Sequence, residues 1–389
     1  MLITDRAPFL EVCETIRKAG VFAWDTEFIQ DRTYWPRLCL VQVAAGDTVA
    51  AIDPFEVGDL QPLWDLVNDP EIQVLVHAGA QDFQIAFDAT GQSARNIFDT
   101  QVAAAFVGYG DSISYAGLLN KVLGHRLSKK ETMTDWSRRP LTDAQLEYAL
   151  DDVRHLRALA DHLLGLLSEV GRENWISEEL VPFETDETFR RDPRKSWVRL
   201  SKRKSLDRKA LAVLREVAAW REETASDRDV PRNRVLGDEL LVEIAKRAPK
   251  DPKGLSAIRN LHDRVVAQWG KEIVRRVKAG LSVPPDDRPQ PPPLRSEDPA
   301  RARIVDMMDL FVQVRSRETG VARNILATRL DLDRAAGIHF GERDGNEPPR
   351  ILRGWRNELV GQDLGRLLDG EIALGVDPKS RLPQVIERG

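Results

Sequence analysis

Two acidic residues interrupt a strongly apolar stretch near the start of the chain, VFAWDTEFIQ at residues 21–30. The pattern predicts a buried strand, and because side chains alternate across a strand, Asp25 and Glu27 share one face, about 7 Å apart. Two neighbouring carboxylates in a buried setting repel each other and are costly to desolvate. A hard divalent cation, Mg²⁺ or Mn²⁺, removes that cost because it prefers oxygen ligands. Alternatively, the strand ends here and both acids lie exposed at its tip.

The composition describes a soluble globular protein with two or three domains, since 42% of the 389 residues are hydrophobic and 31% are charged. The two cysteines, Cys13 and Cys39, are too few for a disulfide framework or a thiolate metal cluster. The N-terminal residues show no signal-peptide pattern, and no run approaches the roughly 18 apolar residues of a membrane helix. We therefore expect a cytoplasmic protein with no membrane partner.

Charge is distributed unevenly along the chain. Residues 1–190 contain 16 Lys and Arg against 31 Asp and Glu, a balance of −15, whereas residues 191–280 contain 24 against 13, a balance of +11. An acidic body joined to a basic module suits a metal-dependent enzyme that acts on a polyanion, with nucleic acid the favoured partner. Alternatively, both charged stretches are ordinary solvated faces.

The order of the expected elements indicates an α/β domain. Closely joined strand patterns predict a meander, and strand–helix alternation follows it, so we expect a mixed sheet covered by helices. Besides residues 21–30, strands are expected at residues 38–44, 48–52, 74–77 and 97–98, and helices at residues 8–19, 60–67, 81–89 and 118–123. Residues 124–140 are polar and basic and are expected to form a loop over the site.

A long helix is expected to begin at Thr142, because Gln145 follows three residues later in a capping-box arrangement. Tyr148 and Asp152 lie four residues apart and so share one face of that helix. The six histidines of the chain show no metal-ligand spacing, so we expect no zinc site. His77 is interpreted as a residue that shapes the turn after its strand.

Two helical modules follow. We expect a first domain at residues 1–175, a linker at 176–204, a helical domain at 205–282, a proline-rich linker at 283–299 and a second helical domain at 300–389. The two helical domains share an organisation of helix, basic connection and helix, which is a faint internal repeat.

Four carboxylates combine into an ordered set, although each has an ordinary explanation alone, such as a first-turn helix acid for Asp82 or a surface acid for Asp152. D-x-E on the first strand, an Asp after the H-A-G turn and Y-x-x-x-D on a late helix resemble the three motifs of the DEDD exonuclease superfamily, in its tyrosine branch. The stretches RTYWPRLCLVQVA, AIDPF, LVHAGAQD, FDTQVAAAF, TDWSRRPLT and EYALDDV resemble ribonuclease D over residues 1–175. LREVAAWREETASDRDVPRNRVLGDELLVEIA resembles a helicase-and-RNase-D C-terminal (HRDC) domain.

The resemblance implies a ribonuclease H-like mixed-sheet exonuclease domain followed by two all-α HRDC-like domains, the second a diverged copy. It implies two divalent metal ions, Mg²⁺ or Mn²⁺, that support phosphodiester hydrolysis. By the same resemblance Asp25 bridges both ions, Glu27 and Asp152 complete one site, and Asp82 binds the other partly through water. Tyr148 orients the nucleophilic water, because a tyrosine is a poor base at neutral pH.

The resemblance further implies a 3′–5′ exoribonuclease that trims structured RNAs, precursor tRNA above all, and releases nucleoside 5′-monophosphates. The alternatives are a 3′–5′ DNA exonuclease with the same site and a non-catalytic RNA-binding adaptor. We expect a monomer whose basic module grips phosphates without reading sequence, or else merely packs on the catalytic domain. Phe28 and Tyr34 are either core aromatics or platforms for a terminal base. The residues expected to contact RNA are Lys202, Arg203, Lys204, Arg208, Arg232 and Arg234.

Overall fold

The structure is a computed structural model, and it describes residues 1–127, 134–200, 203, 205–291, 298–342 and 347–388. Contacts divide the chain into two units, which are described separately. The first unit comprises Met1–Glu27, Leu38–Phe189 and Arg295–Gly389, and the second comprises Phe28–Arg37 and Arg190–Leu294. Part of the loop expected at residues 124–140 lies outside the described residues, as do Lys202 and Lys204.

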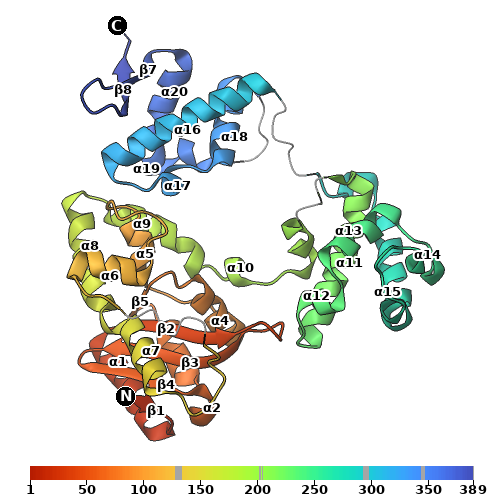
Figure 1. Ribbon diagram of the computed structural model, residues 1–389, viewed down its shortest axis with the longest axis horizontal. Coiled ribbons are helices and arrows are strands. Elements are labelled where there is room, and N and C mark those ends of the chain that lie inside the picture. The colour runs from red at the N-terminus through yellow and green to blue at the C-terminus, as the bar shows by residue number, and fades with distance from the viewer. Residues whose placement is uncertain (128–133, 201–202, 204, 292–297, 343–346, 389) are drawn as a thin grey trace. The chain divides into compact units, whose positions relative to one another are not determined.

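A mixed sheet forms the centre of the first unit (Figure 1). Among the described residues it has six strands in the order β1-β4-β3-β2-β5-β6. β3 runs antiparallel to β4, while β2 and β6 each run parallel to β5. The sheet confirms the expected α/β class and adds a short edge strand, β1, that pairs with β4. The strands are β1 (Leu2–Ile3), β2 (Val21–Ile29), β3 (Arg37–Ala45), β4 (Thr48–Ile52), β5 (Gln73–Val76) and β6 (Ile97–Asp99).

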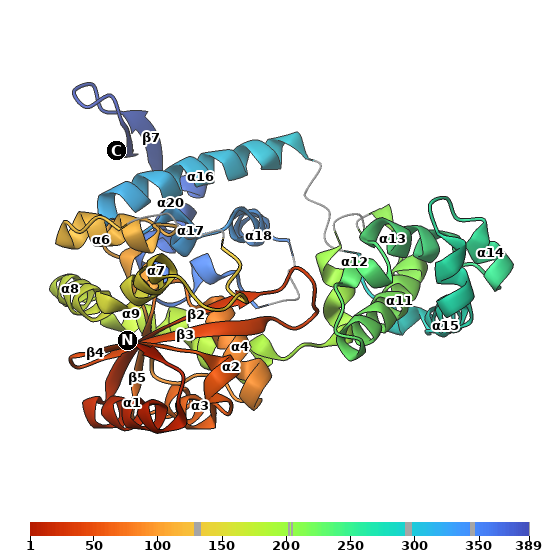
Figure 2. The same ribbon diagram turned by 60° about the horizontal axis from the view of Figure 1, so that its bottom comes forward.

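Helices cover both sides of this sheet, with α1 and α3 on one side and α7 on the other (Figure 2). Apolar residues at helical spacing explain why α1 docks on the sheet, since its stripe of Phe9, Val12, Cys13 and Ile16 is buried. The helices are α1 (Arg6–Ala19), α2 (Pro54–Val57), α3 (Gln61–Val67), α4 (Ala80–Thr90), α5 (Thr100–Ala104), α6 (Tyr115–Leu123), α7 (Asp143–Arg154), α8 (Leu156–Glu169), α9 (Glu173–Leu180) and α10 (Asp186–Phe189), with a 3₁₀ turn at Val181–Glu184.

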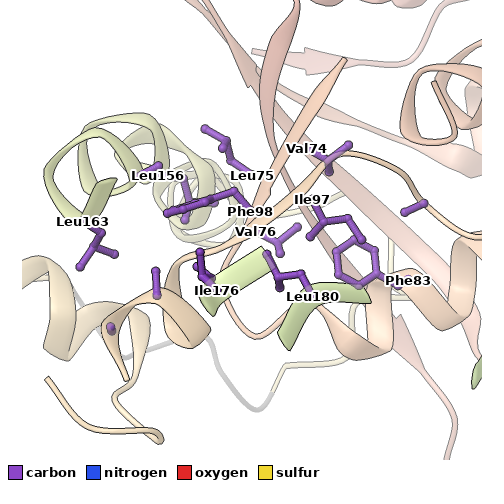
Figure 3. Packing of buried hydrophobic residues seen from close by; sticks show 14 of the residues in the cluster. Val74, Leu75, Val76, Phe83, Ile97, Phe98, Leu156, Leu163, Ile176 and Leu180 are labelled. Atoms are coloured by element: carbon purple, nitrogen blue, oxygen red, sulfur yellow. The ribbon is translucent and has the colours of Figure 1, made fainter. Parts of the chain in front are cut away.

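The core beside the inner strands draws on segments far apart in the chain (Figure 3). Val74, Leu75 and Val76 of β5 pack with residues of β6, α4, α8 and α9. Ile176 and Leu180 of α9 are buried in this core, and so is Phe189 of α10. The stretch expected as a linker at residues 176–204 therefore begins with helices that complete the core of the first unit.

The expected long helix is divided in two. Its start is as predicted, because the Thr142 hydroxyl accepts a hydrogen bond from the Gln145 N–H (3.2 Å) and the Gln145 side chain accepts one from the Thr142 N–H (2.9 Å). The helix stops at His155, where φ is −111° and ψ is 1°, and α8 then begins. Neither proline nor glycine marks the break, so the sequence pattern reads as one continuous helix.

The second unit is built around the long helix α11, whose apolar residues are buried against the later helices. Tyr34, from the connection between β2 and β3, belongs to this core and is only 3% exposed. Its hydroxyl donates a hydrogen bond to Glu222 (2.7 Å). Tyr34 is thus a core aromatic, the first of the two expected roles. The helices are α11 (Arg208–Asp227), α12 (Arg232–Val235), α13 (Asp238–Arg247), α14 (Pro252–Ser256) and α15 (Asp263–Leu281), with 3₁₀ turns at Pro193–Arg199 and Pro285–Asp287.

The C-terminal module is helical, as expected, and ends in a two-stranded hairpin that the sequence analysis did not predict. Its core is continuous with that of residues 1–189 of the first unit, and the Ala322 N–H donates a hydrogen bond to the Ala105 carbonyl (2.7 Å). The elements are α16 (Pro299–Thr319), α17 (Arg323–Leu326), α18 (Arg329–His339), a 3₁₀ turn (Arg350–Leu352), α19 (Gly354–Arg356), a π turn (Asn357–Gly361), α20 (Gln362–Asp369), β7 (Ile372–Val376) and β8 (Pro383–Glu387).

Candidate active site

A pocket of about 250 Å³ opens between the strand that carries the D-x-E pair and helix α7. Four of the five residues expected to act in catalysis line it. The lining residues are Asp25, Thr26, Glu27, His77, Tyr115, Tyr148, Asp152 and Leu156.

Three carboxylates meet in this pocket. One oxygen from each of Asp25, Glu27 and Asp152 lies within 4.8 Å of the others, although α7 follows β2 by more than a hundred residues. The alternation of β2 explains the first two, because Phe22 and Trp24 are buried in the core while Asp25 and Glu27 reach the pocket. Three carboxylates at this spacing form a hard oxygen donor set of the kind that divalent cations prefer.

The electrostatics of the pocket favour a cation. Burial, together with the charges of Asp82 and Asp152, raises the pKa of Asp25 well above its usual range. Burial and the same two acids raise the pKa of Glu27 to about 8. Burial and the charge of Asp151 raise the pKa of Asp152 to about 7. Carboxyl groups with pKa values near 7 hold protons at neutral pH unless a positive charge neutralises them.

Asp82 stands beside this trio rather than within it. It lies in the first turn of α4, is 7% exposed, and accepts a hydrogen bond from the Thr26 hydroxyl. Burial raises the pKa of Asp82 to about 6, although the Thr26 hydrogen bond opposes the rise. The structure therefore brings all four expected acids to one end of β2, with three oxygens converging and the fourth carboxylate held by a neighbouring hydroxyl.

Tyr148 is linked directly to the acid cluster. Its hydroxyl donates a hydrogen bond to Asp152, one helical turn further along α7. The adjacent Asp151 points elsewhere and pairs with Arg154. The helix thus separates two consecutive acids, so that Asp152 faces the pocket and Asp151 serves a surface ion pair.

Tyr115 also lines the pocket, although it is not among the residues predicted from the sequence. Its hydroxyl donates a hydrogen bond to the Asp151 carbonyl (2.9 Å), and its ring lies 5.6 Å from that of His77. His77 contacts the Thr100 hydroxyl (2.9 Å) and the Ile113 carbonyl (3.1 Å), consistent with its interpretation as a turn-shaping residue. Burial lowers the pKa of His77. No motif marks Tyr115, because it reaches the pocket through tertiary packing alone.

The residues expected to contact RNA have different surroundings in the second unit. Arg234 is exposed on α12. Arg232 pairs with the buried Glu222 (2.6 Å), and Arg208 donates to the Arg288 carbonyl (3.1 Å). Arg203 donates to the carbonyl of Leu200 (3.0 Å), and the two lysines of the set lie outside the described residues. Of the described arginines in this set, Arg234 has the most open side chain.

Comparison with known proteins agrees with this geometry. A family model described as 3′-5′ exonuclease matches residues 1–168, and a model described as HRDC domain matches residues 210–277. Ribonuclease D of Nitrobacter hamburgensis is 39% identical over 386 residues, which cover 99% of both chains. Ribonuclease D of Zymomonas mobilis is 36% identical, covering 100% of this chain and 98% of the relative. The chain belongs to the ribonuclease D family. It is accordingly a hydrolytic 3′–5′ exoribonuclease.

A solved ribonuclease D structure supports the same assignment. The Escherichia coli ribonuclease D structure, described as an exoribonuclease involved in structured RNA processing, superposes with a TM-score of 0.82 at 29% identity. The match covers 95% of this chain and 98% of that one. The catalytic core of RRP6 from Trypanosoma brucei shares the fold, with a TM-score of 0.54 at 20% identity.

The residues of the pocket fit the divalent metal use of this exonuclease family. The donor set consists of carboxylate oxygens alone, and burial makes their negative charges costly without a cation.

Helices in the described part of the chain are all too short or too polar to cross a membrane.

Proposed function

We propose that this exoribonuclease trims the 3′ ends of structured RNAs, above all precursor tRNAs, and releases nucleoside 5′-monophosphates. Two ions, Mg²⁺ or Mn²⁺, would be held by Asp25, Glu27, Asp82 and Asp152. The observation that carries the proposal is the convergence of carboxylate oxygens from β2 and α7 within 4.8 Å. When bound, such ions stabilise charge on the attacking and leaving oxygens of a phosphodiester and lower the pKa of water.

The chain's own residues would fix the geometry of attack. Asp25 is affected electrostatically by Asp82, Asp152 and Glu27, which supports the proposal that it would contact both ions. The Tyr148 hydroxyl donates a hydrogen bond to Asp152, which holds it beside the acid cluster and supports a role in orienting a water bound there. A neutral phenol in this position orients the water and does not remove its proton.

Asp82 would take part in the second ion site partly through water. It is held by the Thr26 hydroxyl at the edge of the acid cluster, and this supports a contact less direct than those of the other three acids. Among pocket residues, Tyr115 and His77 would line the path of the terminal nucleotide. Monomeric action in the cytoplasm stays a prediction.

The basic second unit would supply affinity for the phosphate backbone rather than sequence specificity. The exposed Arg234 supports this role, as do the surplus of basic residues at 191–280 and the HRDC match at 210–277. Arg232 would contribute indirectly, since its guanidinium is committed to Glu222. Arg203, Arg208, Lys202 and Lys204 remain predicted contacts.

We further propose that residues 300–389 are a diverged copy of the HRDC domain. Helices α11, α12 and α13 have 20, 4 and 10 residues, and α16, α17 and α18 have 21, 4 and 11. In each module an arginine that opens the short helix pairs with an acid on the long helix, Arg232 with Glu222 and Arg323 with Asp309. The sequences Val-Pro-Arg-Asn and Val-Ala-Arg-Asn surround these arginines.

Digestion of a 3′-extended tRNA tests the proposal. The wild-type enzyme should release mononucleotides with Mg²⁺ or Mn²⁺ and none with a chelator. Asp25→Asn should abolish turnover and leave RNA binding nearly intact, whereas Asp151→Asn should retain turnover because Asp151 pairs with Arg154 outside the cluster. Retained turnover in Asp25→Asn would refute the metal assignment. A DNA strand of equal length, degraded faster than RNA, would refute the substrate class.

A further inference from the structure

Residues 134–140, which lead into helix α7, are joined to the sheet by a half-buried arginine, Arg139. The Arg139 guanidinium forms a bidentate ion pair with Asp53, whose side chain is 2% exposed. Arg139 also donates to the Cys39 carbonyl on β3 (2.7 Å) and, within its own segment, to the Trp136 carbonyl (2.8 Å). Asp53 in turn caps α2 by accepting from the Phe55 N–H (3.0 Å). The charged groups are paired and hydrogen-bonded, so the segment has a fixed position on the sheet.

The other end of the segment is fixed to α7 itself. The Gln145 side-chain amide donates to the Thr134 hydroxyl (2.9 Å) while its oxygen accepts from the Thr142 N–H (2.9 Å). Gln145 is 7% exposed, so these hydrogen bonds are shielded from water. The start of the segment is therefore hydrogen-bonded to the first turn of α7.

Trp136 lies between Thr134 and Arg139 in the segment and packs against Tyr148, which lines the pocket. Its side chain is 4% exposed, and its ring centroid lies 6.1 Å from that of Tyr148, with the planes inclined by 36°. The phenol of Tyr148 is attached to α7 by torsions that helix geometry alone does not fix, because an aromatic χ2 is broad. Contact with a buried indole restricts that freedom.

We propose that Trp136 is a positioning residue for catalysis. It holds the Tyr148 ring so that the Tyr148 hydroxyl stays hydrogen-bonded to Asp152 and is oriented toward the attacking water. The Arg139–Asp53 ion pair fixes the position of Trp136. The inference rests on the proposed role of Tyr148. Trp136 lines neither the pocket nor the acid cluster, so it acts through the tyrosine rather than on substrate or metal.

A double-mutant cycle tests this assignment by steady-state digestion of a 3′-extended RNA. Trp136→Leu should lower kcat about tenfold or more, and Tyr148→Phe by about a hundredfold, with KM within about twofold of wild type. The double variant should have the kcat of Tyr148→Phe, because a misplaced ring no longer matters once its hydroxyl is gone. Trp136→Phe should restore most of the loss, and Arg139→Lys should reproduce part of it.

Trp355→Leu is the matched control, since Trp355 is also 4% exposed in the first unit and lies outside the pocket. It should lower the melting temperature without lowering kcat at a temperature where all variants are folded. Any of three results would overturn the inference: losses in kcat that multiply in the double variant, a rise in KM on Trp136→Leu, or a wild-type kcat in Tyr148→Phe. If Trp136→Leu does not fold, Arg139→Lys combined with Tyr148→Phe completes the same cycle. If the cycle gives one of these results while the wild-type enzyme still digests RNA in a metal-dependent way, the inference is overturned and the proposed function is not.

Discussion

Trp355 stacks on Trp175, with their ring centroids 4.7 Å apart and their planes inclined by only 9°. The pair joins α19 of the C-terminal module to α9 of the exonuclease part. Phe106 packs edge-on against Trp355, with ring centroids 5.5 Å apart. Arg356 adds an ion pair to Glu179. The two helical modules therefore differ, because residues 295–389 share a core with the exonuclease whereas residues 190–294 have a core of their own.

Trp355→Ala should lower the free energy of unfolding of the first unit by about 3–5 kcal/mol, because a buried indole leaves a cavity when truncated. Chemical denaturation followed by circular dichroism measures the loss. Leu330→Ala, in the same module but with Leu330 60% exposed, should change it by less than about 0.5 kcal/mol. Equal effects from the two variants would contradict a shared core.

Arg232→Ala and Arg234→Ala should separate stability from RNA binding, although the two arginines are neighbours on α12. Removing Arg232 leaves the carboxylate of Glu222, 6% exposed, without its bidentate partner and should cost about 3 kcal/mol of unfolding free energy. Removing the exposed Arg234 should leave the free energy of unfolding unchanged. It should reduce the slope of log affinity against log salt concentration by about one, the value expected for the loss of one phosphate contact. Binding titrations across salt concentrations and thermal melts measure both; a destabilised Arg234→Ala with unchanged binding would contradict the expectation.

Local patterns predicted the parts of the site that depend on one element at a time. Alternation along β2 placed Asp25 and Glu27 together, and a three-residue spacing identified the cap that begins α7. The four-residue spacing placed Tyr148 and Asp152 on one face of α7, and the structure adds a hydrogen bond between them. Short-range spacing is sufficient in these cases because the pleat of a strand and the pitch of a helix repeat at fixed periods.

Contacts between distant segments left no periodic signal in the sequence. Thr26 and Asp82 are 56 residues apart, Arg139 and Asp53 are 86 apart, and Tyr34 meets Glu222 across 188. The division at His155 has no proline or glycine to announce it. Each of these features depends on packing that exists only after the chain has folded, so propensity and pattern could not reveal it.

Thr26→Val should shift the acid limb of the pH profile of kcat/KM toward higher pH. The Thr26 hydrogen bond lowers the pKa of Asp82, which burial otherwise raises, so its loss should move the limb upward by about one pH unit. Thr26→Ser keeps the hydroxyl and should retain the wild-type profile. Initial rates on a short RNA across pH, with Mg²⁺ well below saturation so that protons compete with metal for Asp82, measure the shift; an unchanged limb in Thr26→Val would show that Asp82 does not control it.

Metal-free enzyme should lose stability as pH rises from about 4 to about 8, and divalent metal should reverse the loss. Burial raises the pKa of Glu27 to about 8, of Asp152 to about 7 and of Asp82 to about 6. The folded state then binds more protons than the unfolded state between the unfolded values near 4 and these folded values, so the free energy of unfolding falls with pH. Because Mn²⁺ binds the deprotonated carboxylates, the rise in melting temperature that it causes should be larger at about pH 8.5 than at about pH 5.5. Thermal melts with chelator and with Mn²⁺ at both pH values measure this, and Glu27→Gln should flatten the pH dependence whereas Glu169→Gln, on the far end of α8, should not. A metal effect independent of pH would mean that the acid cluster is already ionised without a cation.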